Sequence, residues 1–179
     1  GKYLRDSGRR SEVFLTTKVR SRVGDGPNDA GTSRYHVMSG IDASLRRLQT
    51  DHIDLYLIHA YDPTTPLEET MRALDDVVRA GKARYVGCSN WAAWRVMQAL
   101  WISDVNNLAR LDCIQSEFNI VRPGMAAETI PTCLEEGVAV TAYSPLGSGF
   151  LTGKHSRQGP ESETKFGARD SERGGSLKR

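Results

Sequence analysis

The segment Asp54-Leu55-Tyr56-Leu57-Ile58-His59 is the most informative part of the chain for its architecture. Its four central residues form an unbroken apolar run, and the turn signal Asp62-Pro63 follows shortly after it. A short run that is apolar on both faces is typical of a strand buried in a parallel sheet. His59 comes at the carboxyl end of this predicted strand, where functional groups gather in sheets with helical crossovers.

Predicted strands and helices alternate on either side of this segment. β-Favouring residues predict further strands at 13–18, 85–88, 111–115 and 138–143, and apolar residues at helical spacing predict helices between them. Such alternation implies a parallel sheet with right-handed crossovers. Because a βαβ unit takes roughly 30 residues or more, the chain can hold about five strands but not eight. An open doubly wound sheet and an arc of a larger barrel both fit this pattern.

Two helix starts have recognisable capping patterns. Ser33 precedes apolar residues that recur at helical spacing, so we expect its side chain to cap the helix that follows. Thr65-Pro66-Leu67-Glu68 predicts a capping box with proline at the first helical position. Each helix would then run from one predicted strand to the next with one face buried.

The composition is that of an ordinary globular domain. The chain has 179 residues, of which 39% are hydrophobic and 26% charged, and a formal net charge of +2. Basic residues are interleaved with acidic ones, which argues against a nucleic-acid surface, and no apolar run approaches the ~20 residues of a membrane span. Cys88, Cys113 and Cys133 have neither metal-ligand nor disulfide spacing. Because we also find no signal-peptide pattern, we expect three buried thiols in a reducing cytoplasm.

Polar or aromatic side chains come at the carboxyl end of each predicted strand. Because the ends of adjacent parallel strands lie at the same edge of a sheet, we expect these side chains to converge on one rim. Taken singly, each has a simpler structural interpretation, such as a solvated strand end or a helix cap. Their convergence, rather than any single residue, predicts a functional site. The residues are Lys18, His59, Ser89, Asn90, Gln115, Tyr143 and Ser144.

Several short motifs belong together by their order and spacing. They are Thr16-Thr17-Lys18-Val19, Ser44-Leu45-Arg46-Arg47-Leu48, Ile53 to His59, Ala80 to Asn90, Gln115, and Tyr143-Ser144-Pro145-Leu146-Gly147. In this order they resemble the aldo-keto reductase family, and within it the bacterial branch related to aryl-alcohol dehydrogenases and potassium-channel β subunits. The resemblance implies an α/β fold, namely a partial (β/α)8 TIM barrel with roughly strands 3 to 7 and the helices between them.

The resemblance also implies an activity. Members of this family reduce aldehydes and ketones with NADPH, so the expected cofactor is NADPH (NADP+) and the expected substrate is a small aldehyde or ketone. Lys18 resembles the lysine that lowers the pKa of a catalytic tyrosine, because a nearby ammonium group favours the phenolate. His59 resembles the histidine that orients and polarises the carbonyl group as negative charge develops on its oxygen.

Further residues match the cofactor contacts of the family. Ser89, Asn90 and Gln115 match the polar groups that bind the nicotinamide carboxamide and so orient the ring. Tyr143 matches the aromatic residue that stacks on the nicotinamide. The loop that runs along the pyrophosphate is matched by Ser144, Leu146, Ser148 and Gly149.

Part of the family pattern is absent from these 179 residues. No Asp-Thr-Ala…Tyr-Gly pattern supplies the catalytic tyrosine and its aspartate, and neither the eighth strand nor the basic motif for the 2′-phosphate occurs. We therefore expect the chain, which opens at Gly1, to be an internal fragment that forms one partial barrel domain over 1–179 and is inactive on its own. The polar, Gly-rich residues 155–179 predict a mobile loop.

Two other interpretations stay open from the sequence. The first is a non-catalytic nucleotide-binding scaffold or regulatory subunit on the same fold, like the channel β subunits. His59 argues mildly against it, because such subunits often lack a histidine there, and a tyrosine in the upstream motif would favour the enzyme. The second is an unrelated doubly wound nucleotide-binding domain, but the Gly-rich turn expected after its first strand is absent.

Overall fold

The described residues of the computed structural model, 1–153, contain one curved parallel sheet; the mobile loop predicted at 155–179 lies outside them. Five strands lie side by side in chain order, and each neighbouring pair is parallel. The predicted alternation of strands and helices is confirmed. The strands are β1 (Thr16–Val19), β2 (Ile53–Ile58), β3 (Ala83–Ser89), β4 (Cys113–Glu117) and β5 (Ala139–Tyr143).

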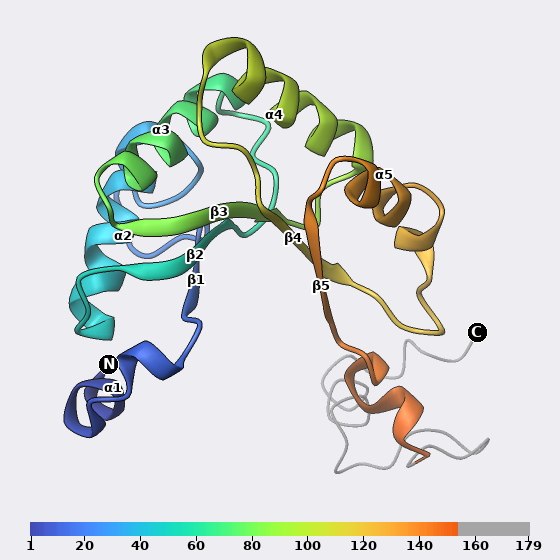
Figure 1. Ribbon diagram of the computed structural model, residues 1–179, viewed down its shortest axis with the longest axis horizontal. Coiled ribbons are helices and arrows are strands. Elements are labelled where there is room, and N and C mark those ends of the chain that lie inside the picture. Colours follow the sequence, from blue (N-terminus) through green and yellow to red (C-terminus); the bar gives the residue numbers. More distant parts are fainter. Residues whose placement is uncertain (154–179) are drawn as a thin grey trace.

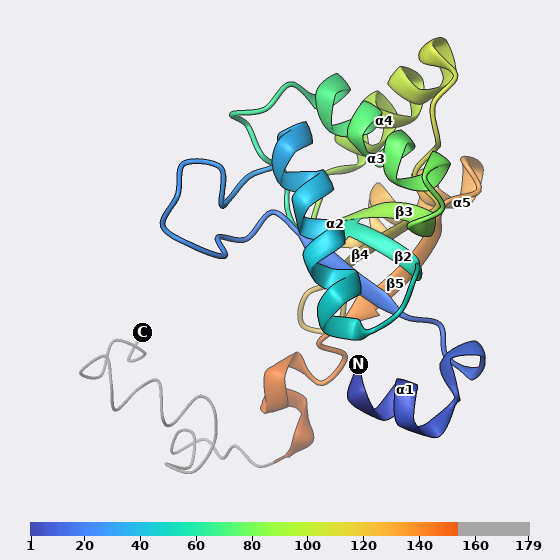
Figure 2. The ribbon, with the colours of Figure 1, turned by 90° about the vertical axis from the view of Figure 1, so that its left-hand side faces the viewer.

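A layer of helices lies along the convex side of the sheet (Figure 1). It consists of α2 (Arg34–Leu48), α3 (Leu67–Arg79), α4 (Ala93–Asn106) and α5 (Thr129–Glu135). The short helix α1 (Lys2–Ser7) lies apart from this layer, near the amino end of β1, and the loop after β1 projects away from the sheet (Figure 2). Short 3₁₀ turns occur at η1 (Arg10–Glu12), η2 (Gly124–Ala126) and η3 (Gly147–Thr152). Among residues 1–153, no helix has the length and apolar character needed to cross a membrane.

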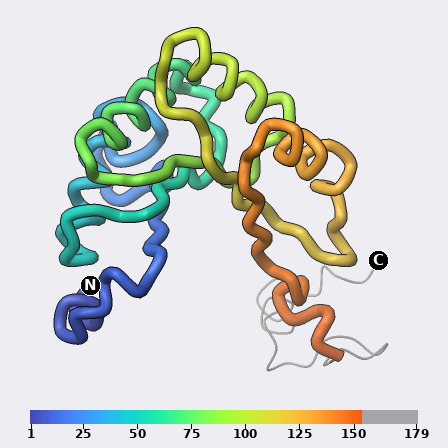
Figure 3. Tube along the Cα trace, viewed as in Figure 1, coloured from blue at the N-terminus to red at the C-terminus, as the bar shows by residue number. Residues whose placement is uncertain are grey.

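The sheet is an open arc. Within residues 1–153, β1 pairs only with β2 and β5 pairs only with β4, so both are edge strands. The Cα trace shows the same arch, with a concave side that no helix of residues 1–153 covers (Figure 3). Parallel strands that alternate with helices on one side only are an arc of a (β/α)8 barrel, as predicted.

The main core lies between the sheet and the helices. Val37 and Ile41 of α2, Met71 of α3 and Leu100 of α4 are buried there together with Tyr56 of β2. The Tyr56 hydroxyl group also donates a hydrogen bond to Val37 O at 3.2 Å. Because β2 has core residues on both faces, its sequence is apolar without alternation. The smaller cluster on the concave face consists of Leu55, Leu57 and Cys113.

The structure confirms one predicted cap and corrects the other. The Ser33 hydroxyl oxygen accepts a hydrogen bond from His36 N at 3.3 Å and so caps α2. The capping box predicted at Thr65-Pro66-Leu67-Glu68 is wrong, because α3 begins with proline in the N-cap position and has no side-chain cap. Thr65 Oγ1 instead donates to Asp62 Oδ2 at 3.0 Å. A buried carboxylate is a stronger acceptor, and it directs this hydroxyl group into the preceding loop.

Two strands begin more than one residue later than predicted, β1 by three residues and β4 by two. Both starts share a cause, which is an aspartate side chain that takes a backbone N–H group near the first ladder bond. Leu15 N donates to Asp54 Oδ2 at 2.8 Å, and Val86 N donates to Asp112 Oδ2 at 2.9 Å. Asp54 therefore anchors the start of the sheet between β1 and β2.

Candidate functional site

The carboxyl ends of the five strands form one rim of the sheet (Figure 1). The register pairs Lys18 with Leu57, two residues before His59, and it pairs Ser89 with Gln115. Paired residues in a parallel sheet face the same side, and Leu57 belongs to the concave cluster. Lys18 therefore faces the concave side, and alternation along the strands places His59 and Gln115 there as well.

Asn90 connects the ends of three strands. Its backbone has a φ of 59°, in the left-handed region that asparagine tolerates better than most residues. In this conformation Asn90 N donates to Gln115 O at 2.9 Å and lies 3.2 Å from Ser116 Oγ. Its side-chain Nδ2 donates to Ser89 Oγ at 3.0 Å, and its Oδ1 accepts from the Tyr143 hydroxyl group at 2.9 Å. These bonds fix the orientation of the amide group at the rim.

Gln115 and Tyr143 keep part of their surface open beside this amide. Gln115 Nε2 donates to Thr141 Oγ1 at a long 3.5 Å, which leaves its carbonyl oxygen available. Tyr143 is 37% exposed although its hydroxyl group is bonded to Asn90. The rim thus combines two side-chain amides, the buried hydroxyl group of Ser89 and an accessible aromatic ring.

The loop after β5 turns sharply at the next residue. Ser144 has a φ of 56°, and its carbonyl oxygen accepts hydrogen bonds from Asn119 Nδ2 at 3.0 Å and from Gly147 N at 2.9 Å. Ser148 and Gly149 also have positive φ, at 57° and 100°, while Leu146 is exposed. Left-handed turns of this kind can point backbone N–H groups toward an anion.

Lys18 and His59 lie at the same rim but outside this hydrogen-bonded group. His59 is exposed, and its Nδ1 is 3.2 Å from Ser21 Oγ. Within residues 1–153, no hydrogen bond or ion pair engages the Lys18 ammonium group. The structure therefore brings Ser89, Asn90, Gln115 and Tyr143 into direct contact, and it places Lys18 and His59 on neighbouring strands without bonding them to that group.

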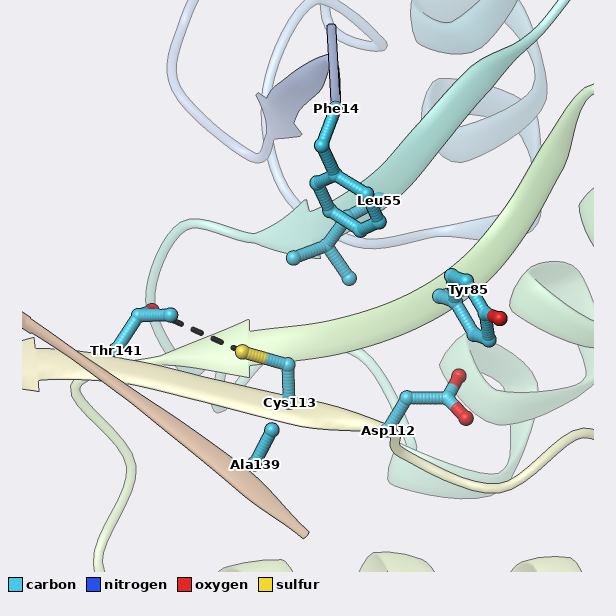
Figure 4. Close-up of a pocket in the computed structure, with 7 residues that line it drawn as sticks. All are labelled: Phe14, Leu55, Tyr85, Asp112, Cys113, Ala139 and Thr141. Atoms are coloured by element: carbon cyan, nitrogen blue, oxygen red, sulfur yellow. Dashed lines mark hydrogen bonds between the residues drawn. The ribbon is translucent and has the colours of Figure 1, made fainter. Parts of the chain in front are cut away.

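The concave face below the rim has an apolar hollow of about 370 Å³ (Figure 4). None of the residues predicted for the site lines it. Two of its lining atoms, Cys113 Sγ and Thr141 Oγ1, lie 3.7 Å apart. Thr141 Oγ1 also accepts the long hydrogen bond from Gln115 Nε2. We attribute this hollow to the open side of the sheet rather than to substrate binding. Its lining residues are Phe14, Leu55, Tyr85, Asp112, Cys113, Ala139 and Thr141.

Four residues that contact the predicted site residues were not predicted from the sequence. Ser116 and Asn119 are buried and hold the backbone of Asn90 and Ser144 respectively. Thr141 contacts Gln115, and Ser21 contacts the His59 ring. Small polar residues inside or shortly after a strand are common in sequences, so only their placement beside a recognised site residue could have indicated them.

The cysteines are structural. Cys88, Cys113 and Cys133 are free and buried, and burial raises the pKa of each thiol. A thiol whose pKa is raised by burial is a poor nucleophile at neutral pH. Nor does any group of three or more His, Cys, Asp or Glu side chains in residues 1–153 have the arrangement of a metal site.

Comparison with known proteins identifies the family of the chain. Residues 1–171 match the aldo/keto reductase family. The chain is 38% identical over 168 residues to "Probable voltage-gated potassium channel subunit beta" of Arabidopsis thaliana, which covers 93% of this chain and 51% of that protein. It is also 38% identical over 159 residues to "Uncharacterized oxidoreductase YrpG" of Bacillus subtilis, with 86% and 49% covered.

A fungal relative is an enzyme by name. The chain is 42% identical over 132 residues to "Versiconal hemiacetal acetate reductase" of Aspergillus parasiticus, which covers 74% of this chain and 38% of that protein. The chain spans about half the length of the first two curated relatives. The family match over nearly all of the chain, together with the parallel open-barrel sheet, shows that the chain belongs to the aldo/keto reductase family.

Proposed function

We propose that this chain forms part of an NADP(H)-dependent reductase that transfers a hydride between the nicotinamide and the carbonyl group of an aldehyde or ketone. The observation that carries the proposal is the hydrogen-bonded series Tyr143–Asn90–Ser89 beside Gln115, at the carboxyl rim of an aldo/keto reductase sheet. The names of the bacterial and fungal relatives, an oxidoreductase and a reductase, support it.

The residues present fit a nicotinamide nucleotide. The nicotinamide carboxamide binds best where it meets both a hydrogen-bond donor and an acceptor. The side-chain amides of Asn90 and Gln115 each contain an NH2 donor and a carbonyl acceptor. The Tyr143 ring, partly exposed and fixed by Asn90, offers a flat surface for an aromatic ring. In the positive-φ turn from Ser144 to Gly149, the N–H groups of Gly147 and Gly149 donate to carbonyl oxygens, so Leu146 N and Ser148 N are the groups that we propose for a phosphate. When bound, NADPH would supply the hydride, and we infer the preference for NADPH over NADH from the family.

Lys18 and His59 are the proposed catalytic groups of this chain. His59 is exposed at the rim, where it could donate a hydrogen bond to a carbonyl oxygen as negative charge develops there. Lys18 faces the same side and keeps its ammonium group unpaired within residues 1–153. A cation in that place would favour the phenolate form of a neighbouring tyrosine. Because these 179 residues contain no motif with that tyrosine and its aspartate, we expect little or no turnover from them alone.

The test uses the full-length reading frame. NADPH binding is followed by the change in NADPH fluorescence, and turnover is followed with a small aldehyde. We expect His59→Ala to lower kcat by ~10²-fold or more while the Kd for NADPH changes little. His52→Ala is the matched control, because that ring lies before β2 at the opposite end of the sheet. Absence of NADPH binding, or equal turnover in both variants, would contradict the proposal.

A second function has a specific observation in its favour. Relatives from Arabidopsis thaliana and Schizosaccharomyces pombe, 38% and 37% identical, are named "Probable voltage-gated potassium channel subunit beta" and "Putative voltage-gated potassium channel subunit beta". A regulatory subunit that binds the nucleotide without reducing a carbonyl would use the same rim. In the same assay it would bind NADPH, and the wild-type protein would show no turnover of the aldehyde. A cytoplasmic location belongs to either proposal, and the three buried thiols support it.

A further inference from the structure

The contact between Ser21 and His59 suggests a role for a residue that the proposed function does not include. We propose that Ser21 is a positioning residue, which fixes the tautomer and the orientation of the His59 imidazole. The proposal rests on the proposed function, because it explains how His59 would present a proton to a carbonyl oxygen. Ser21 lies in the loop after β1, outside the motifs that suggested the site.

Backbone contacts on both sides make this a defined arrangement. His59 N donates to Val19 O at 2.9 Å, which holds the end of β2 beside the end of β1. The next residue, Arg20, has a φ of 122°, a value that a non-glycine residue rarely adopts. Gly31 N donates to Arg20 O at 2.9 Å and stabilises the turn. This turn brings Ser21 Oγ to 3.2 Å from His59 Nδ1.

The chemistry of the pair follows from the two ring nitrogens. A neutral imidazole carries one proton, and the nitrogen that accepts a hydrogen bond is the one without it. If the Ser21 hydroxyl group donates to Nδ1, the proton of His59 lies on Nε2. Nε2–H can then donate to the substrate carbonyl oxygen, whereas the other tautomer would present a lone pair to it. No proton is transferred between Ser21 and His59, so Ser21 acts only by orienting the His59 ring.

The cationic side chain that follows Ser21, Arg22, is engaged away from this contact. Arg22 Nη1 donates to Gly24 O at 3.0 Å and to Gly26 O at 3.2 Å, so its guanidinium group is engaged by the loop. Among residues 1–153, Ser21 supplies the hydrogen bond that the His59 side chain makes. Removal of this hydroxyl group should therefore free the ring to rotate and to change tautomer.

The kinetic test compares five variants of the full-length reading frame. We expect Ser21→Ala to lower kcat by about 3- to 10-fold, the usual effect of one lost hydrogen bond, with the Kd for NADPH unchanged. Ser21→Thr should restore most of the loss because it keeps a hydroxyl group. Ser11→Ala, an exposed serine before β1, is the matched control. In the His59→Ala background, Ser21→Ala should have no further effect, and a full additional loss there would overturn the proposal.

A spectroscopic readout separates this inference from the reductase assignment. With ¹⁵N-labelled histidine at about pH 8.5, where imidazole is ordinarily neutral, the ring nitrogens report which one carries the proton. We expect His59 to be protonated at Nε2 in the wild-type protein and to show a mixture of tautomers in Ser21→Ala. Identical spectra in the two proteins would refute the role of Ser21 even if the protein is a reductase. A tautomer change in a protein without turnover would uphold the contact and contradict the proposed activity.

Discussion

The two ends of the sheet are built from different interactions. At the amino end, aspartate side chains bond the strands together: Asp54 accepts Leu15 N and lies 2.9 Å from Arg10 Nη2, and Asp112 accepts Val86 N. At the carboxyl end, the backbone itself is unusual. Six non-glycine residues in 1–153 have positive φ, and two of them are helix C-caps. The other four follow β1, β3 and β5, and they are Arg20, Asn90, Ser144 and Ser148.

The difference between the two ends suggests that the amino end of the sheet serves stability and the carboxyl end serves function. A satisfied, buried carboxylate links strands and lowers the free energy of the folded state. A residue held in a sparsely populated backbone conformation costs free energy, and such residues persist mainly where a site requires them. Substitutions at the amino end should therefore change the free energy of unfolding, whereas substitutions at the carboxyl rim should change nucleotide binding and turnover.

Lys18→Met should have the largest effect. If the ammonium group assists proton transfer from a tyrosine, its removal should lower kcat by ~10²–10⁴-fold in the full-length protein. The free energy of unfolding should change by less than about 0.5 kcal/mol, because no ion pair within residues 1–153 is lost. Steady-state kinetics and urea unfolding measure the two quantities. Lys2→Met, at an exposed position in α1, is the control, and comparable kinetics in both variants would show that Lys18 has no catalytic role.

Asp54→Ala should show the opposite behaviour. It removes the carboxylate partner of Arg10 and leaves Leu15 N without its acceptor in a partly buried place. Because Arg10 keeps its hydrogen bonds to Thr50, Val13 O and His52 O, we expect the free energy of unfolding to fall by about 2 kcal/mol. The Kd for NADPH should be unchanged under conditions where the variant is folded. The control is Asp42→Ala, which breaks a partly exposed ion pair with Lys82 and should cost less than about 1 kcal/mol. Equal losses in the two variants would refute the role given to the amino-end carboxylate.

Asp62 is a buried carboxylate on the carboxyl side, and it makes stability depend on pH. Burial alone would raise its pKa, but hydrogen bonds from Thr64, Thr32 and Thr65 outweigh burial and lower the pKa from 3.8 to about 2. Because the folded-state pKa is the lower one, this contribution of roughly 2 kcal/mol is present above the unfolded-state pKa and is lost as pH falls through the folded-state pKa.

The pH dependence can be tested with Asp62→Asn. The difference in unfolding free energy between wild type and variant should be largest above about pH 5 and should shrink toward about pH 2. Denaturant unfolding at a series of pH values measures it. Asp104→Asn, at an exposed position in α4, should give a small difference at every pH. A difference for Asp62→Asn that stays constant with pH would show that the low pKa does not contribute to stability.

The strands and the rim could be predicted from the sequence, and the reason is physical. Apolar runs such as 55–58 specify strands buried on both faces, and parallel pairing then forces the residues after each strand onto one edge. Lys18, His59, Asn90, Gln115 and Tyr143 were found through that argument. Their roles came from the family resemblance, since no periodicity in the sequence specifies a nicotinamide contact.

The contacts that hold the rim could not be predicted. The left-handed conformation of Asn90 depends on Ser116, which lies one strand away, and the turn at Ser144 depends on Asn119. The capping box failed for a similar reason, because Asp62 competed for the Thr65 hydroxyl group. In each case several hydrogen-bond partners compete, and these partners come together only in the folded chain.

Tyr143→Phe should have the smallest effect, and it tests the hydrogen-bonded rim most directly. The substitution keeps the ring that is proposed to stack on the nicotinamide and removes only the hydroxyl group that donates to Asn90 Oδ1 at 2.9 Å. Because a single hydrogen bond contributes about 1 kcal/mol, we expect the Kd for NADPH to rise by roughly 5-fold. Tyr35→Phe, on the exposed face of α2, should leave it unchanged. If Tyr143→Phe binds NADPH as tightly as the wild type while Asn90→Ala binds it weakly, Asn90 acts without the help of its neighbour, and the orientation of its amide must come from Ser89 and the backbone alone.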